Sequence, residues 1–138
     1  MDDQASGFNG AAPSGATILV VDDEDGVRGL IHRILTRAGF EVVMASSGPE
    51  AIALMEGYEG HVDLLLVDVI MPRMSGRSVA EQLGLPTVFM SGYPNRIDTG
   101  QGILPEDAAF LPKPFTRSDL LEAVSTALRD TAGSTKTF

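Results

Sequence analysis

Hydrophobic and polar positions along the chain follow two different periods, and together they predict an α/β fold. Short aliphatic runs such as Leu64–Val67 have the length and composition of strands that are buried on both faces. Between these runs, apolar residues recur at the spacing of one helix face, as in Val27, Leu30 and Ile31. Strands that alternate with helices predict a doubly wound parallel sheet with helices on both faces.

The predicted elements can be placed from these patterns and from local start and stop signals. The predicted strands are Thr17–Val21, Glu41–Ala45, Asp63–Asp68, Thr87–Ser91 and Ala108–Pro112. The predicted helices are Gly26–Gly39, Ser46–Gly57, Ser75–Gly84 and Thr116–Asp130. Gly39 is a stop signal for the first helix, and the pattern from Ser47 to Glu50 is a capping box for the second.

One further helix is required between the last two strands, because parallel neighbours need a crossover connection. The available sequence, YPNRIDTGQGILPED, contains two prolines and two glycines and is a poor helix former. We therefore expect a short or broken fourth helix, at about Asn95–Thr99, followed by an irregular loop. This segment is expected to be the least stable part of the domain.

The two ends of the chain differ in composition from the middle. Met1–Gly15 and Thr131–Phe138 are rich in small and polar residues, which is typical of flexible linkers. We expect a single folded domain over Ala16–Asp130. The leader is compatible both with the natural start of a stand-alone protein and with a linker from a longer chain.

Composition narrows the range of partners. The net charge of −9 over 138 residues disfavours direct binding to nucleic acid or to an anionic membrane. The chain has no cysteine, which excludes disulfide and thiol chemistry and agrees with a cytoplasmic location. No apolar run approaches the ~20 residues of a membrane span, and the acidic N-terminus is unlike a signal peptide.

Polar residues stand at the carboxyl ends of the predicted strands, where ligands bind in doubly wound sheets. Asp22 and Asp23 follow the first strand, and Asp68 ends the third. Ser91 ends the fourth strand, and Lys113 follows the fifth. Three carboxylates, one hydroxyl and one ammonium should therefore converge on one edge of the sheet.

The chemistry of this set favours phosphoryl transfer. Three neighbouring carboxylates resist ionising together unless a cation joins them, and Mg²⁺ prefers such oxygen ligands. Lysine and serine can hold phosphate oxygens. A carboxylate can also act as the nucleophile and form an aspartyl phosphate.

The motifs ILVVDDED, LLLVDVIMP, FMSG and FLPKPF, in this order, resemble the receiver domain of two-component response regulators. The resemblance covers nearly all of the folded part and implies a five-stranded sheet in the order 2-1-3-4-5. It implies phosphoryl transfer from a phosphohistidine on a histidine kinase or a histidine phosphotransfer protein. FMSGYP and FLPKPF are most similar to receivers attached to hybrid sensor histidine kinases. The downstream partner is not specified.

The same resemblance implies a role for each carboxylate. Asp68 would be the phosphoacceptor and a ligand of Mg²⁺. Asp23 would bind the metal directly, whereas Asp22 would act largely through water. The backbone carbonyl of Ile70 would be the third protein ligand.

The resemblance also implies how a bound phosphoryl group is held and sensed. Ser91 and Lys113 would bind its oxygens, and the Lys113–Pro114 peptide bond would be cis. Phe110 matches the aromatic switch position of the family and should move together with Ser91. Such a domain is not a turnover enzyme in itself, although it catalyses its own phosphorylation and dephosphorylation.

Two alternatives remain at this point. A flavodoxin-like flavin binder shares the fold class, but an acidic DDED loop after the first strand would repel the flavin phosphate. A pseudo-receiver would bind a partner without ever being phosphorylated. Intact Asp23, Asp68, Ser91 and Lys113 argue against it.

Overall fold

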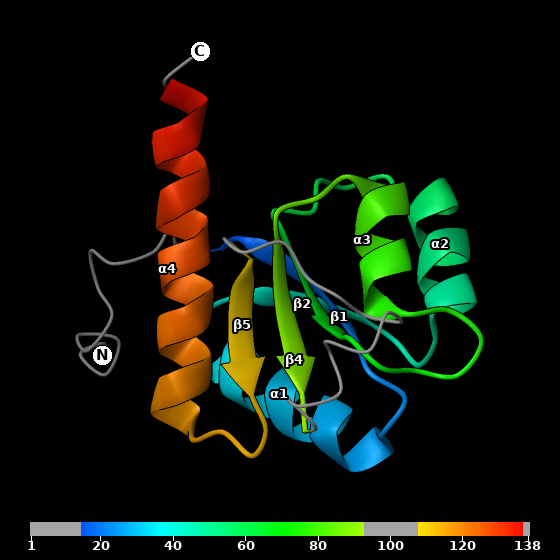
Figure 1. Cartoon of the computed structure of the whole chain (residues 1–138). Coiled ribbons are helices and arrows are strands. Elements are labelled where there is room, and N and C mark those ends of the chain that lie inside the picture. The colour runs from blue at the N-terminus through cyan, green and yellow to red at the C-terminus, as the bar shows by residue number, and fades with distance from the viewer. Residues whose placement is uncertain (1–14, 93–107, 137–138) are drawn as a thin grey trace.

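Five parallel strands form one sheet with helices packed on both faces (Figure 1). The computed structural model describes residues 15–92 and 108–136. The strand order is β2-β1-β3-β4-β5, which confirms the predicted fold class and order. The strands are β1 (Thr17–Val21), β2 (Glu41–Ala45), β3 (Leu64–Asp68), β4 (Thr87–Ser91) and β5 (Ala109–Pro112).

Four helices lie within the described residues, and their positions are close to those predicted. They are α1 (Asp25–Arg37), α2 (Gly48–Gly57), α3 (Gly76–Leu83) and α4 (Arg117–Lys136). The weak helix predicted at about Asn95–Thr99 lies outside the described residues. Within the described part of the chain, no helix has the length and apolar character that crossing a membrane requires.

The sheet separates two hydrophobic clusters, as the alternation of side chains along each strand requires. On one face, Ile18 and Val20 of β1 pack in the cluster that includes residues of α1 and α4. On the other face, Leu19 and Val21 pack in the cluster that includes residues of α2 and α3. Figure 1 shows α4 on one side of the sheet and the α2–α3 pair on the other. Because both faces are covered, β1 and β3 are buried along their whole length.

Local signals account for where two of the helices start. The Ser47 hydroxyl caps α2 by accepting from the Glu50 N–H at 3.2 Å, as the capping pattern predicts. The Glu50 carboxylate reaches back to the backbone N–H of Ser46 at 2.6 Å, and this bond lowers the pKa of Glu50. At α3, the Ser75 hydroxyl accepts from the Ser78 N–H at 3.2 Å.

The last helix is longer than predicted. α4 continues to Lys136, past the predicted end of the folded part at Asp130 and into the segment 131–138 that was expected to be flexible. The helix thus extends beyond the predicted boundary at Asp130 as far as Lys136. Extending an existing helix needs no new nucleus, and the sequence TAGSTK contains no proline to stop it.

Candidate functional site

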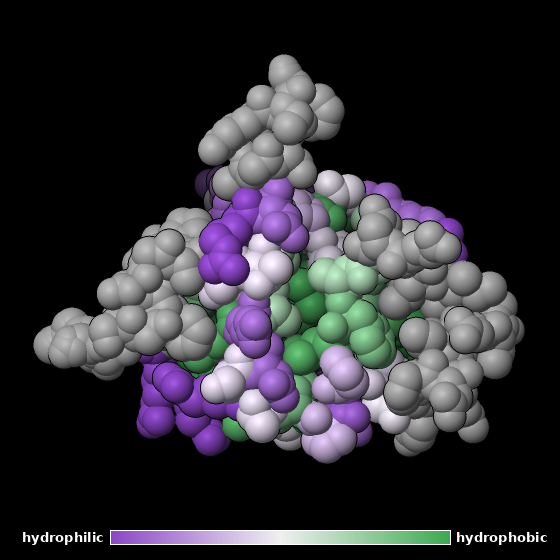
Figure 2. All heavy atoms as spheres, turned by 60° about the vertical axis from the view of Figure 1, so that its left-hand side comes forward, coloured by the Kyte–Doolittle hydropathy of each residue, from purple (hydrophilic) through white to green (hydrophobic). Residues whose placement is uncertain are grey.

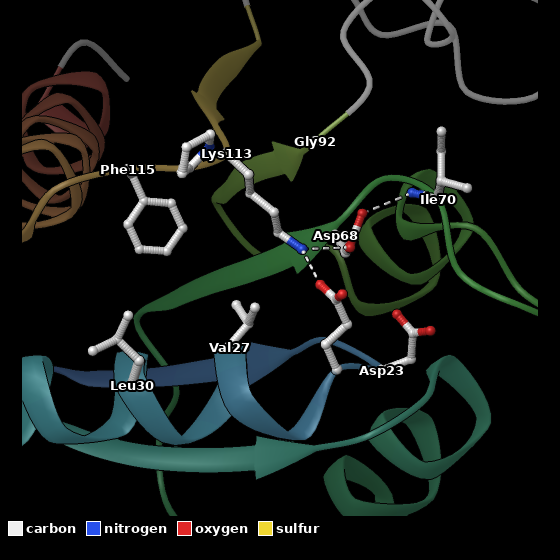
Figure 3. A pocket seen from close by; sticks show the side chains of 10 residues that line it. Asp23, Val27, Leu30, Asp68, Ile70, Gly92, Lys113 and Phe115 are labelled. Atoms are coloured by element: carbon white, nitrogen blue, oxygen red, sulfur yellow. Dashed lines mark hydrogen bonds and ion pairs between the residues drawn. The ribbon is translucent and has the colours of Figure 1, made fainter.

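Lys113 lies at the centre of the polar residues at the carboxyl edge of the sheet. Its Nζ is 2.9 Å from Asp22 Oδ2, 2.9 Å from Asp68 Oδ2 and 3.2 Å from Glu24 Oε1. The backbone N–H of Lys113 donates to the carbonyl of Ser91 at 2.9 Å, which ties the end of β5 to the end of β4. The Lys113–Pro114 peptide bond is cis, as the resemblance implies. Figure 3 shows the lysine side chain reaching across the strand ends towards Asp68.

Asp68 is the last residue of β3, and both of its carboxylate oxygens have partners. Oδ1 accepts from the backbone N–H of Ile70 at 3.0 Å, and Oδ2 pairs with Lys113. Only 7% of the residue is exposed. Burial raises the pKa of Asp68, and the hydrogen bond from Lys113 opposes this shift only in part. The carboxylate is therefore held in a fixed orientation beside an ammonium group.

The pKa of Lys113 responds to the same neighbours. Burial alone would lower the pKa of its ammonium, but the hydrogen bonds to Asp68 and Asp22 outweigh it, and the net shift is upward. Lys113 is consequently a fixed positive charge at neutral pH.

The turn after β1 is held by hydrogen bonds to Asp22. The carboxylate of Asp22 is fully buried, and its Oδ1 accepts from the Glu24 N–H at 2.9 Å. Its backbone carbonyl accepts from Nη1 of Arg28 at 2.9 Å, while Nη2 of Arg28 pairs with Asp25 at 2.6 Å. Arg28 on α1 thus fastens the acidic turn to the first helix.

The carboxylates that cluster in the structure differ in one residue from the predicted ligands Asp22, Asp23 and Asp68: Glu24 takes the place of Asp23. Among the described residues, Asp22, Glu24 and Asp68 offer carboxylate oxygens that all lie within 4.8 Å of one another. Asp23 is exposed and lines the same pocket without belonging to this group. Glu24 was not among the sequence candidates, although the third acid of DDED was a visible signal. Clustered carboxylate oxygens are hard ligands that fit Mg²⁺.

A pocket of about 500 Å³ opens over these charged groups. Its charged side contains Asp23, Glu24, Asp68 and Lys113. Its apolar side contains Val27, Leu30, Ile70 and Phe115, and Figure 3 labels all four of them. Leu30 and Ile70 are among the large hydrophobic residues that stay exposed, at 41% and 37%. The pocket can therefore accept a charged group against an apolar rim.

The two predicted switch residues occupy neighbouring strands. Ser91 is fully buried at the end of β4, where it is paired in register with Pro112 of β5. Phe110 is half-buried on β5, opposite Phe89. It lines a second hollow, between β5 and α4, and not the pocket above Asp68. Figure 2 shows apolar surface on this side of the molecule, next to the polar outer side chains of α4.

The doubly wound fold and the carboxylate–lysine site together define a class: α/β domains that can accept a phosphoryl group at the carboxyl edge of a parallel sheet. The family model described as "response regulator receiver domain" matches residues 18–125. The chain therefore belongs to the response regulator receiver domain family, which confirms the resemblance found in the motifs.

Individual relatives agree with this assignment. The sensor kinase CckA of Brucella abortus is 40% identical, over 82% of this chain and 12% of its own length. An uncharacterized transcriptional regulatory protein, YrkP of Bacillus subtilis, is 31% identical over 81% of this chain and 49% of its own length. Among solved structures, the receiver domain of the hybrid histidine kinase CckA is 37% identical with a TM-score of 0.68. It matches 82% of this chain and 99% of that domain. The chain thus spans half or less of these two curated relatives but nearly all of an isolated receiver domain.

Proposed function

We propose that this domain accepts a phosphoryl group on Asp68 from a phosphohistidine of a partner protein. The observation that carries the proposal is the position of Asp68 at the end of β3, with Lys113 Nζ 2.9 Å from its Oδ2. In the transfer, an Asp68 oxygen forms a bond to phosphorus while the bond between phosphorus and the imidazole nitrogen breaks. The imidazole keeps the bonding electron pair and later takes up a proton from water. Lys113 supplies positive charge next to the transferred oxygens.

Mg²⁺ fits the oxygen donors of the site. We propose that Asp23, Asp68 and the carbonyl of Ile70 hold it directly, with Asp22 acting through water and Glu24 nearby. When bound, the ion neutralises negative charge on the carboxylates and on the phosphoryl oxygens. The chain's own contribution is to orient Asp68 through the Ile70 N–H and to keep Lys113 charged.

Ser91 and Phe110 are the proposed path by which phosphorylation changes the surface. Ser91 stands at the end of the strand next to Asp68, and Phe110 lies on the following strand. If the Ser91 hydroxyl turns towards a phosphoryl group, space becomes available into which the Phe110 ring can move. The packing of Phe110 against the hydrophobic cluster on the α2–α3 face would then change.

The proposed donor is a histidine kinase or a histidine phosphotransfer protein, in the cytoplasm. Similarity to the sensor kinase CckA of Brucella abortus and to the receiver domain of a hybrid histidine kinase CckA supports an origin in a hybrid sensor histidine kinase. The net charge of −9 supports a protein partner and no direct contact with nucleic acid.

Intact-mass spectrometry with acetyl phosphate tests whether Asp68 is the phosphoacceptor. The wild type should gain the mass of one phosphoryl group in the presence of Mg²⁺, and Asp68→Asn should gain none. Asp130→Asn is the matched control, because Asp130 is an exposed aspartate on α4. Normal phosphorylation of Asp68→Asn, or no phosphorylation of the wild type, would disprove the assignment.

A further inference from the structure

Gly76, the first residue of α3, lies against the backbone of Asp68. A Cβ atom built on Gly76 would overlap the carbonyl oxygen of Asp68 and lie 2.8 Å from its carbonyl carbon. It would also lie 3.0 Å from Cα of Val69. All three atoms belong to the main chain, so no side-chain rotation can make room. The φ angle of Gly76 is not among the positive ones, so space and not backbone conformation requires the glycine.

The peptide that Gly76 faces is also held from its other side. Its nitrogen is that of Val69, whose N–H donates to the carbonyl of Met90 on β4 at 2.8 Å. This peptide cannot turn away from a methyl group at position 76 without weakening that bond. The Asp68–Val69 peptide is thus enclosed between β4 and the start of α3.

The first turn of α3 is equally restricted. The N–H of Gly76 donates to the carbonyl of Val69 at 2.9 Å, which closes the loop that carries Ile70. Val79, one turn further along α3, is fully buried. Moving the helix outward would therefore break a loop-closing hydrogen bond and shift a core residue.

We infer that Gly76 is a positioning residue for the phosphoacceptor, an inference that rests on the proposed function. The close approach of α3 fixes the main chain of Asp68, and the main chain fixes the carboxylate between Ile70 and Lys113. A side chain at position 76 would displace the carboxylate from both partners. Phosphoryl transfer depends chiefly on positioning, so a displacement of about 1 Å can cost ~100-fold in rate.

The test compares Gly76→Ala and Ser75→Ala, both made in a Gly29→Ala background. Gly29 has no atom near its Cβ position, so this background should keep the domain folded. Ser75→Ala removes the hydroxyl that caps α3 but adds no atom next to Asp68, so it loosens the same turn by another route. The maximal rate of mass gain is measured at saturating Mg²⁺ and acetyl phosphate, together with Tm and the carbonyl chemical shift of Asp68.

Gly76→Ala should lower the maximal rate by about 10–100-fold and shift the Asp68 carbonyl resonance. Ser75→Ala should lower Tm but keep the rate within about twofold of the parent, because the folded fraction keeps its site. An unchanged rate in folded Gly76→Ala, or an equal loss of rate in Ser75→Ala, would overturn this inference but not the proposed function. Failure of Gly76→Ala to fold even in this background would also overturn it, because the contact would then serve the fold. Absence of phosphorylation in the Gly29→Ala parent would overturn the proposed function and the inference together.

Discussion

The Nζ of Lys113 lies 2.9 Å from Oδ2 of Asp68, although 45 positions separate the two residues in the chain. The same ammonium also pairs with Asp22 and Glu24, so one cation faces three carboxylates. Without a metal ion, the site therefore carries an excess of negative charge within a partly buried space. This imbalance determines how the domain should respond to pH, to substitution and to added Mg²⁺.

Asp68→Asn should stabilise the domain in metal-free buffer at neutral pH. Burial raises the pKa of folded Asp68 above its ordinary value of 3.8. At any pH between the ordinary pKa and the raised pKa, the folded state therefore binds more protons than the unfolded state. The contribution of Asp68 to stability is therefore complete below pH 3.8 and is lost as pH rises through the folded pKa. The asparagine variant lacks this loss. At pH 7 we expect its free energy of unfolding to be higher by about 1 kcal/mol, which corresponds to a Tm about 2–4 °C higher.

Thermal unfolding of both proteins between pH 3.5 and pH 7 measures this effect. The Tm difference should be small at the acidic end and should grow with pH. Asp130→Asn, on an exposed position, should show no such growth. A constant difference across the range would mean that the pKa of Asp68 is not raised in the folded state.

Lys113→Met should destabilise the metal-free domain and increase its response to Mg²⁺. Removing the ammonium leaves Asp22, Glu24 and Asp68 without their shared counter-charge, at a cost of roughly 2–4 kcal/mol. A divalent ion can restore the balance, so the rise in Tm on adding Mg²⁺ should exceed that of the wild type. Arg117→Met, at an exposed position at the start of α4, is the control and should respond as the wild type does. An equal Mg²⁺ response in all three proteins would contradict a charge balance that depends on Lys113.

Substitutions at Asp23 and Glu24 should weaken Mg²⁺ binding to different degrees. Asp23→Ala removes a proposed direct ligand, and we expect at least about a tenfold loss of affinity by isothermal titration calorimetry. The Glu24 side chain is 61% exposed, so solvent screens its charge and Glu24→Gln should cost only a few-fold. The reverse ranking would show that Glu24, which already lies near the oxygens of Asp22 and Asp68, is the direct ligand.

Gly29→Ala should raise the stability of the domain by about 1 kcal/mol. Gly29 lies in the interior of α1, is exposed, and has no atom within 4 Å of its Cβ position. Alanine restricts the unfolded chain and favours the helix without meeting a neighbour. Urea denaturation should give a higher midpoint with an unchanged slope, whereas a lower midpoint would indicate a neighbour that the structure does not contain.

Much of the fold was readable from the sequence because its signals are local. Runs such as Leu64–Val67 have the length and composition of buried strands, and their alternation with amphipathic helices favours a parallel sheet. In a parallel sheet the carboxyl ends of the strands share one edge. The meeting of Asp22, Asp68 and Lys113 therefore followed from the order of the elements, before any distance was known.

Other features were decided only by the tertiary structure, because they depend on backbone paths through turns and on contacts between distant segments. The turn after β1 directs Glu24, and not Asp23, into the group of carboxylates around Asp68. Sequence spacing cannot determine this, since a change of a few dihedral angles in a turn redirects a side chain. The need for glycine at position 76 is likewise invisible in the sequence, where Gly76 looks like an ordinary residue at a helix start. It arises because the packing of α3 brings this residue against the peptide of Asp68, and only the folded arrangement leaves no room for a methyl group there.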